Sequence, residues 1–141
     1  MKDKYKLALM DMAERFSLTS TAERLKVGCI IFKNDSIISL GVNGQPPKWS
    51  TEVCEDENYD TLSTVRHAED AALQKLWLST ETSEGATVFV THSPCLGCAI
   101  KLVNAKISKV YYRYEYRSYD GVNHLIKSGV EVGGLNSEVV D

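Results

Sequence analysis

The residues with the clearest potential for chemistry lie in two short motifs, His67-Ala68-Glu69 and Pro94-Cys95-Leu96-Gly97-Cys98. An imidazole and two thiols are typical ligands of a catalytic zinc ion, which keeps its fourth position for water, whereas a structural zinc takes four protein ligands. We therefore expect His67, Cys95 and Cys98 to bind zinc. Glu69 lies too near His67 in the chain to share its direction, so we expect it to act as a general acid and base beside the metal.

The spacing of these residues indicates how the fold must position them. Cys95 and Cys98 stand in the first turn of an expected helix, on one face of it. Pro94 is well tolerated at such a start, because its missing N–H would be unpaired there. His67 begins another expected helix, and the chain between the motifs is long enough for that helix and a returning strand. We therefore expect two helix starts to meet at one sheet edge, where their partial positive charge favours thiolate and hydroxide.

A zinc site with a free carboxylate suits hydrolysis. Bound zinc can lower the pKa of water from 15.7 to about 7, and a positioned carboxylate contributes about 10²- to 10⁴-fold by moving protons. These are the two requirements for hydrolytic removal of an amino group from an amidine carbon. An alternative is that Cys54 supplies a fourth ligand and closes a structural site. The chain would then be a zinc-stabilised binding module without catalysis.

The composition is that of an ordinary globular protein, with 43% hydrophobic and 25% charged residues in a chain of 141. We expect a single domain over residues 1–141, with a loose tail over 133–141. The net charge of −3, without an evident basic face, argues against a long nucleic acid as partner. No apolar run is long enough for a bilayer, and acidic residues interrupt the apolar N-terminus. We therefore expect no membrane partner, no signal peptide and a cytoplasmic location.

Hydrophobic periodicity predicts an α/β protein, in which an initial hairpin is followed by alternating helices and strands over a mixed sheet. Asn34-Asp35 predicts the hairpin turn, and residues 41–60 predict a long loop. Trp77 is expected in the core. The buried face of the first helix is expected to hold Tyr5, Leu9, Met12, Ala13 and Phe16. The predicted helices are 3–16, 68–78, 94–105 and 121–128, and the predicted strands are 27–33, 36–42, 87–91, 109–112 and 129–132.

The two metal motifs match the general H-x-E…P-C-x-x-C signature of zinc-dependent nucleobase deaminases. With the sequences around them, the chain resembles the cytidine deaminase superfamily, and within it the deoxycytidylate (dCMP) deaminases of the viral and cellular type. The similarity extends over roughly Ser17 to Val132. Besides the metal motifs, it is carried by residues 26–31, 37–44, 84–95, 107–112, 116 and 125–132.

This resemblance implies a cytidine deaminase-like three-layer α/β/α fold, with a mixed five-stranded sheet and helices on both faces. It also implies zinc-dependent hydrolysis of dCMP to dUMP and ammonia, supplying dUMP for dTMP synthesis. A related alternative keeps the chemistry but changes the substrate to another cytosine nucleoside or nucleotide, or to a tRNA adenosine. The implied location is cytoplasmic, in the host cytoplasm if the protein is viral.

The resemblance further implies contacts to the substrate. Asn43 is expected to touch the nucleotide, while Ser20 and Lys26 are expected near its phosphate, with Arg24 as a weaker candidate. The remaining expected substrate contacts are Ala68, Ser93 and Tyr116, the last an aromatic residue of the kind that stacks on bases.

Regulation by nucleotides is also implied. The family is usually a hexameric homo-oligomer, activated by dCTP with Mg²⁺ and inhibited by dTTP. Residues 41–44 correspond to a Gly-Tyr-Asn-Gly stretch associated with nucleotide sensing in the family, and Val42 stands here in place of the tyrosine.

Overall fold

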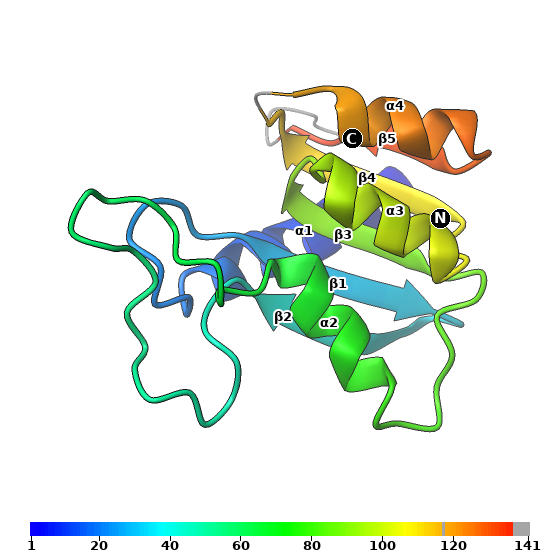
Figure 1. The fold of residues 1–141 in the computed structure, drawn as a ribbon. Helices are drawn as coiled ribbons and strands as arrows, with labels where there is room; N and C mark the ends of the chain where they lie inside the picture. The colour runs from blue at the N-terminus through cyan, green and yellow to red at the C-terminus, as the bar shows by residue number, and fades with distance from the viewer. Residues whose placement is uncertain (117, 137–141) are drawn as a thin grey trace.

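A single mixed sheet of five strands forms the middle of three layers (Figure 1). The computed structural model describes residues 1–116 and 118–136. Along the chain the elements are α1 (Asp3–Ser17), β1 (Gly28–Lys33), β2 (Ser36–Val42), α2 (Ala68–Leu76), β3 (Thr87–His92), α3 (Leu96–Asn104), β4 (Lys109–Tyr114), α4 (Asp120–Lys127) and β5 (Glu131–Gly134). The α/β class, the three layers and the five strands agree with the sequence-based prediction.

The sheet has the strand order β2-β1-β3-β4-β5. Strand β1 pairs antiparallel with both β2 and β3, whereas β4 is parallel to both of its neighbours, β3 and β5. Asn34 and Asp35 connect β1 to β2 with φ values of 51° and 61°, the left-handed conformation that a two-residue hairpin turn requires. Since β3 and β4 are parallel, the residues that follow them, 93–95 and 115–116, leave the sheet at the same edge.

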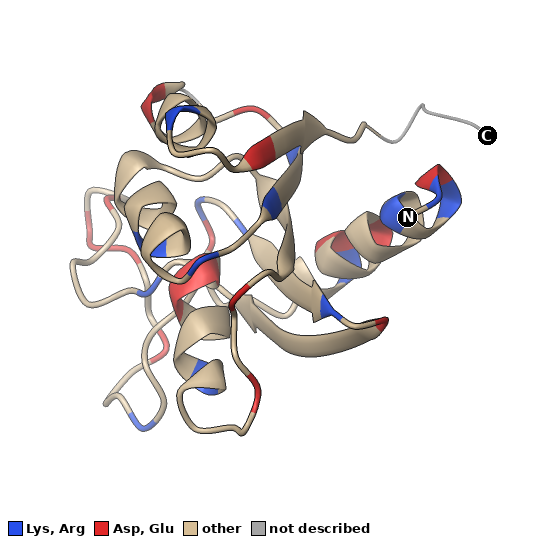
Figure 2. Ribbon diagram, turned by 90° about the vertical axis from the view of Figure 1, so that its right-hand side faces the viewer, with Lys and Arg blue, Asp and Glu red and all other residues tan. Residues whose placement is uncertain are grey.

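Each face of the sheet has its own core, because alternate residues of a strand point to opposite sides. Ile30 and Phe89 pack with residues of α1 on one face. On the other face, Ile31, Val88 and Val110 belong to the cluster that includes residues of α2, α3 and α4. Figure 2 shows α1 alone on its side of the sheet, carrying acidic and basic residues along its length.

Two details of the sequence-based prediction are wrong. The buried residues of α1 are Leu9, Met10, Ala13 and Ser17, so Tyr5 and Met12 are exposed. The helix packs against the sheet through a face rotated from the expected one. Trp77 is 77% exposed, because α2 ends at Leu76 and the tryptophan lies beyond the helical segment that packs on the sheet.

The tail predicted to begin at residue 133 begins later. Gly133 and Gly134 belong to β5, and the Leu135 N–H donates to the carbonyl of Tyr112. Residues 137–141 of the predicted tail lie outside the described part of the chain. No helix within the described residues is both long and apolar enough to cross a membrane.

Candidate active site and metal centre

The three expected metal ligands stand at the beginnings of two neighbouring helices. His67 is the residue just before α2, Cys95 is the residue just before α3, and Cys98 lies in the first turn of α3. Asp70 fixes the start of α2, because its Oδ2 accepts the His67 backbone N–H at 3.2 Å. Its Oδ1 accepts a hydrogen bond from Lys101 Nζ of α3 at 2.6 Å. One carboxylate therefore ties the two helix starts together.

The ligand atoms of His67, Cys95 and Cys98 fit a zinc ion. His67 Nδ1 lies 3.1 Å from Cys98 Sγ and 3.6 Å from Cys95 Sγ, and the three atoms are all within 4.8 Å of one another. Tetrahedral zinc, with bonds of about 2.0 Å to nitrogen and about 2.3 Å to sulfur, separates its ligand atoms by about 3.5–3.8 Å. The arrangement therefore needs only a small adjustment to hold the ion. Within residues 1–116 and 118–136 this is the one cluster of its kind.

The two thiols are electrostatically different. Hydrogen bonds with Cys98 and then with His67 lower the pKa of Cys95 to about 4, which makes Cys95 a thiolate. The same bond between the cysteines, together with burial, raises the pKa of Cys98. The Cys98 backbone N–H also donates to Cys95 Sγ at 3.5 Å, and a helix start favours such a negative charge. One ligand therefore has the anionic form that a metal requires, and the other must release a proton to bind it.

Glu69 is the acidic residue placed beside the metal ligands. It lies in the first turn of α2, is 5% exposed and lines a cavity together with His67 and Cys95. Burial raises its pKa to about 7, although a hydrogen bond from its own backbone N–H and the charge of His67 act in the opposite direction. A carboxyl group with a near-neutral pKa can both accept and donate a proton at physiological pH.

The cavity has a volume of about 390 Å³, within the range of about 300–1,000 Å³ that is typical of small-molecule sites. Four of the residues expected to contact substrate line it: Asn43, Ala68, Ser93 and Tyr116. The Asn43 side chain also supports the wall, because it accepts the Val27 N–H at 2.9 Å and donates to the Leu25 carbonyl at 2.7 Å. Ser93 Oγ accepts the Tyr116 N–H at 2.6 Å and so holds Tyr116 in the wall.

The other two expected substrate contacts lie elsewhere. Lys26 Nζ donates to the Ser20 carbonyl at 2.5 Å, and neither residue lines the cavity. The Ser20 hydroxyl donates to the carbonyl of Asn43 and accepts the Ala22 N–H, so it fixes the backbone next to the wall. Arg24, the weaker candidate from the sequence, does line the cavity.

Sequence reasoning missed the part of the wall that comes from the long connection between β2 and α2, which extends beyond the sheet in Figure 1. Glu55, Thr61 and Val65 line the cavity from this connection. No motif marks them, and only the folded loop brings them near the metal ligands. His92, at the end of β3, also lines the cavity, and its Nδ1 bonds to Thr91 Oγ1 at 2.9 Å.

Cys54 does not complete the metal site. Its buried Sγ contacts Thr21 Oγ1 at 3.5 Å and the Glu52 carbonyl at 3.4 Å, and it lies outside the cluster of metal-ligating side chains. The fold therefore does not bring together the four protein ligands of the structural alternative. Three ligands with a cavity beside them are the pattern of a catalytic zinc.

Comparisons with known proteins agree with this geometry. Residues 3–114 match the family described as the cytidine and deoxycytidylate deaminase zinc-binding region. The crystal structure of a dCMP deaminase from the cyanophage S-TIM5, in complex with dCMP and dUMP, is similar with a TM-score of 0.94. The two sequences are 45% identical, and the similarity covers 96% of this chain and 99% of that one.

Two relatives found by sequence extend the similarity. A deoxycytidylate deaminase of Mycobacterium phage D29 is 30% identical over 126 residues, which cover 80% of this chain and 94% of that protein. An uncharacterized deaminase of Aliivibrio fischeri is 34% identical over 111 residues, which cover 79% of this chain and 74% of that protein. Through its zinc motifs, its fold and these similarities, the chain belongs to the cytidine and deoxycytidylate deaminase family.

Proposed function

We propose that the protein catalyses the hydrolytic deamination of dCMP to dUMP and ammonia, and so supplies dUMP for dTMP synthesis. The observation that carries the proposal is the buried Glu69 carboxyl beside three zinc-ligand atoms at the wall of a nucleotide-sized cavity. The near-complete similarity to a deaminase solved with dCMP and dUMP supports the choice of substrate.

The residues of the site can perform each proton transfer of this reaction. His67, Cys95 and Cys98 would hold zinc, which when bound acts as a Lewis acid that lowers the pKa of water. Glu69 accepts a proton from the attacking water and delivers it to the ring nitrogen N3 while a C–O bond forms at C4. Glu69 then takes the remaining proton of the new C4 hydroxyl group and passes it to the amino group. The C4–N bond breaks, ammonia leaves, and C4 keeps the carbonyl oxygen of dUMP.

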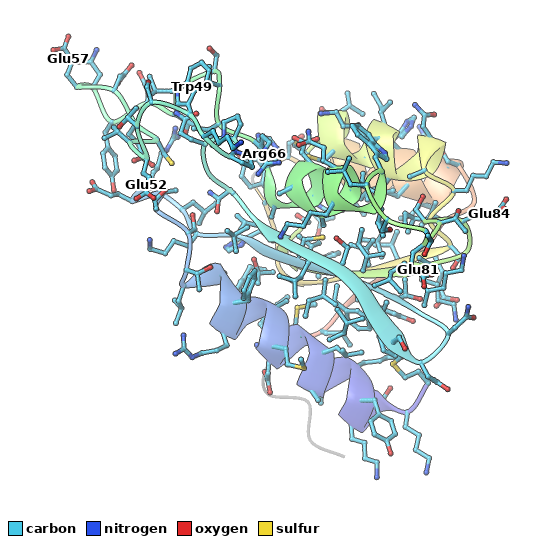
Figure 3. The ribbon with its side chains drawn as sticks, turned by 90° about the horizontal axis from the view of Figure 1, so that it is seen from below. Trp49, Glu52, Glu57, Arg66, Glu81 and Glu84 are labelled. Carbon is cyan, nitrogen blue, oxygen red and sulfur yellow. The ribbon has the colours of Figure 1, made fainter. Side chains whose placement is uncertain are left out.

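The test is the variant Glu69→Gln, which keeps the size of the side chain but removes its acid–base function. We expect one zinc per chain in both proteins and a turnover of dCMP that is lower by about 10²- to 10⁴-fold in the variant. Glu81→Gln is the matched control, since Glu81 lies at the opposite end of the molecule from the long loop (Figure 3). A zinc-loaded wild-type protein that releases no ammonia from dCMP would contradict the proposal.

Other substrates are distinguished by the same assay. Ammonia release from CMP, deoxycytidine, cytidine and a tRNA substrate, measured beside dCMP, identifies the preferred one. A preference for any of these over dCMP would keep the proposed deamination chemistry and change only the substrate. A protein that binds zinc but turns over none of them, dCMP included, would favour the non-catalytic binding module.

We also propose that the deaminase activity is regulated by nucleotides: dCTP, accompanied by Mg²⁺, activates it, and dTTP inhibits it. A second cavity of about 280 Å³ supports it, since Val42, Asn43 and Gly44 line it. Gln45 Oε1 and Arg66 Nε, from two other lining residues, are buried without a hydrogen-bond partner in the described chain. Figure 3 shows Arg66 and Trp49 on the loop at this end of the molecule. Kinetics with dCMP that do not respond to either triphosphate would contradict this part.

We propose a homo-oligomer, specifically a hexamer, located in the cytoplasm, with no membrane or long nucleic acid as partner. Large apolar side chains on and after the three helices of one face support an association of subunits, because such side chains are usually covered. They are Trp77, Leu78, Leu96, Ile100 and Ile126, which are 77%, 92%, 45%, 41% and 56% exposed. Light scattering coupled to size-exclusion chromatography tests the assembly, and a monomer at micromolar concentration would contradict it.

A further inference from the structure

The two helices that carry the metal ligands are joined by two polar links, one helical turn apart. The first consists of ligand atoms, with His67 Nδ1 at 3.1 Å from Cys98 Sγ. The second is the ion pair between Asp70 Oδ1 and Lys101 Nζ, at 2.6 Å. Asp70 follows His67 by three residues at the start of α2. Lys101 follows Cys98 by three residues within α3. Residues three apart are neighbours on one helix face, so the ion pair lies beside the metal ligands.

This ion pair is the directional contact between α2 and α3 apart from the ligands themselves. Among the described residues it is the one salt bridge that joins the two helices. Both helices also pack on the same face of the sheet (Figure 1), where Leu73 and Leu102 belong to one apolar cluster. Apolar packing is not directional, so it does not by itself fix the spacing of two side chains finely. A metal site needs ligand distances within about 0.2 Å.

Asp70 connects the ion pair to a zinc ligand through its second oxygen. Oδ2 accepts the backbone N–H of His67 at 3.2 Å, while Oδ1 accepts the hydrogen bond from Lys101. The side chain of Asp70 is 14% exposed and that of Lys101 is 56% exposed. An ion pair with one partner mostly in water contributes little to folding stability. Its effect is on position, because the carboxylate cannot follow a movement of α3 without displacing the backbone of His67.

We propose that Asp70 and Lys101 are positioning residues of the metal centre, whose ion pair sets the separation of His67 from Cys98 and thereby the affinity for zinc. Neither residue belongs to the two metal motifs. The inference rests on the zinc site of the proposed function, but not on which nucleotide the cavity takes. Removing a group that orients a metal ligand typically changes metal affinity by about 10- to 100-fold.

A pure charge effect predicts the opposite result for Lys101. Zinc brings two positive charges, so a nearby ammonium group opposes its binding by Coulomb repulsion. If Lys101 acted only through its charge, Lys101→Met would bind zinc more tightly than the wild-type protein. If Lys101 acts by holding Asp70, the same variant binds zinc more weakly. The direction of the change in affinity therefore separates positioning from electrostatics.

The experiment measures the zinc Kd by competition with a chelator and, separately, the melting temperature of the zinc-free protein. We expect Lys101→Met to raise the zinc Kd by about 10- to 100-fold. Its melting temperature without zinc should fall by less than about 5 °C, because the ion pair is partly exposed. Lys101→Arg keeps a cation that can bond to the carboxylate, so its zinc Kd should stay within about threefold of the wild-type value.

Asp70→Asn tests the other partner, because it keeps an acceptor for the His67 N–H and removes the charge that holds Lys101. We expect a rise in zinc Kd of the same size. The double variant Asp70→Asn/Lys101→Met should exceed the larger single effect by less than about threefold, since both changes break one link. Lys106→Met is the matched control. It breaks the 3.5 Å ion pair with Glu84, whose two side chains are 73% and 66% exposed, and should leave the zinc Kd unchanged.

Each outcome decides the role of the ion pair. Zinc binding by Lys101→Met that equals or exceeds that of the wild-type protein would refute positioning. A loss that Lys101→Arg does not restore, or that Lys106→Met shares, would also refute it. A large fall in the zinc-free melting temperature would assign the pair to folding stability instead. These measurements contain no nucleotide, so variants that lose zinc as expected in a protein that does not deaminate dCMP would overturn the proposed function and leave this inference standing.

Discussion

A larger residue in place of Gly121, at the start of α4, should disturb the zinc site, although this position is far from both metal motifs in the sequence. A Cβ atom added at this position would lie 2.0 Å from the Pro94 carbonyl oxygen, and 2.8 Å from both the carbonyl carbon and the oxygen of Cys95. All three are backbone atoms of the turn that presents Cys95, so none can move aside by a side-chain rotation. The prediction is that Gly121→Ala disturbs the metal site from outside it.

The size of the effect follows from these distances. The closest ordinary contact between carbon and a carbonyl oxygen is about 3.3 Å, so the two backbones must separate by roughly 1.3 Å. Metal ligands tolerate deviations of only about 0.2 Å. If one sixth of this displacement were transmitted to Cys95 Sγ, the sulfur would move by about 0.2 Å, which is the whole of that tolerance. Overpacking of this kind costs about 1–3 kcal/mol, which lowers the melting temperature by roughly 4–12 °C in a chain of this size.

Calorimetric unfolding and competition with a zinc chelator test this prediction. Gly97→Ala is the matched control, because a Cβ at Gly97, within the metal motif itself, would have Cys95 Sγ at 4.0 Å as its nearest neighbour. We expect Gly121→Ala to lose at least about tenfold in zinc affinity as well as stability, and Gly97→Ala to lose neither. If both variants unfold and bind zinc like the wild-type protein, the close packing of α4 on the cysteine turn is not what holds Cys95 in place.

Three further predictions concern single side chains. Burial lowers the pKa of His92, against the opposing effect of Glu14, so on acidification the unfolded chain binds a proton before the folded chain does. The free energy of unfolding should therefore fall as pH drops below about 6.5. In urea titrations between pH 7 and 5, His92→Gln should show a weaker fall than the wild type. Arg113, with its side chain 3% exposed, pairs with Asp11 at 2.7 Å and Glu14 at 3.0 Å. Arg113→Met should lower the free energy of unfolding by only about 1–2 kcal/mol in chemical denaturation, because both carboxylates can still reach water. An unchanged denaturation midpoint would show that the two ion pairs contribute nothing to stability. Cys54→Ser should retain one zinc per chain by elemental analysis, because Cys54 is outside the metal cluster, and a loss of zinc would restore the four-ligand alternative.

The local sequence was sufficient to predict the elements that carry the chemistry. The hairpin turn at Asn34 and Asp35 follows from residue types that tolerate positive φ, and both adopt it. The helix start at Cys95 follows from Pro94 and the cysteine spacing. The convergence of the His67 and Cys95 helix starts follows from the order of helices and strands along the chain. In each case the determinant lies within a few residues or in the order of the elements.

The rest of the site depends on contacts between distant segments, which no local pattern records. Arg24 and Lys26 are chemically similar, and only the hydrogen bonds of Glu55 and the Ser20 carbonyl decide which of them faces the cavity. Trp77 was predicted in the core because the helical period was extended two residues too far. The buried side of α1 includes Met10 rather than Met12, because packing on Ile30 and Phe89 of the sheet, and not the apolar pattern of the helix alone, decides which face is covered.

The wall of the cavity is divided between two kinds of support. His67, Glu69 and Cys95 stand at helix ends anchored to the sheet, whereas Arg24, Glu55 and Thr61 come from segments outside the helices and strands. The expected metal-binding and acid–base residues and this part of the cavity wall therefore come from separate stretches of the chain. For protein engineering, residues 20–26 and 51–62 are therefore segments that can be exchanged together. We expect that exchanging them between relatives would transfer substrate preference, while the metal-binding residues and their acid–base partner stay unchanged.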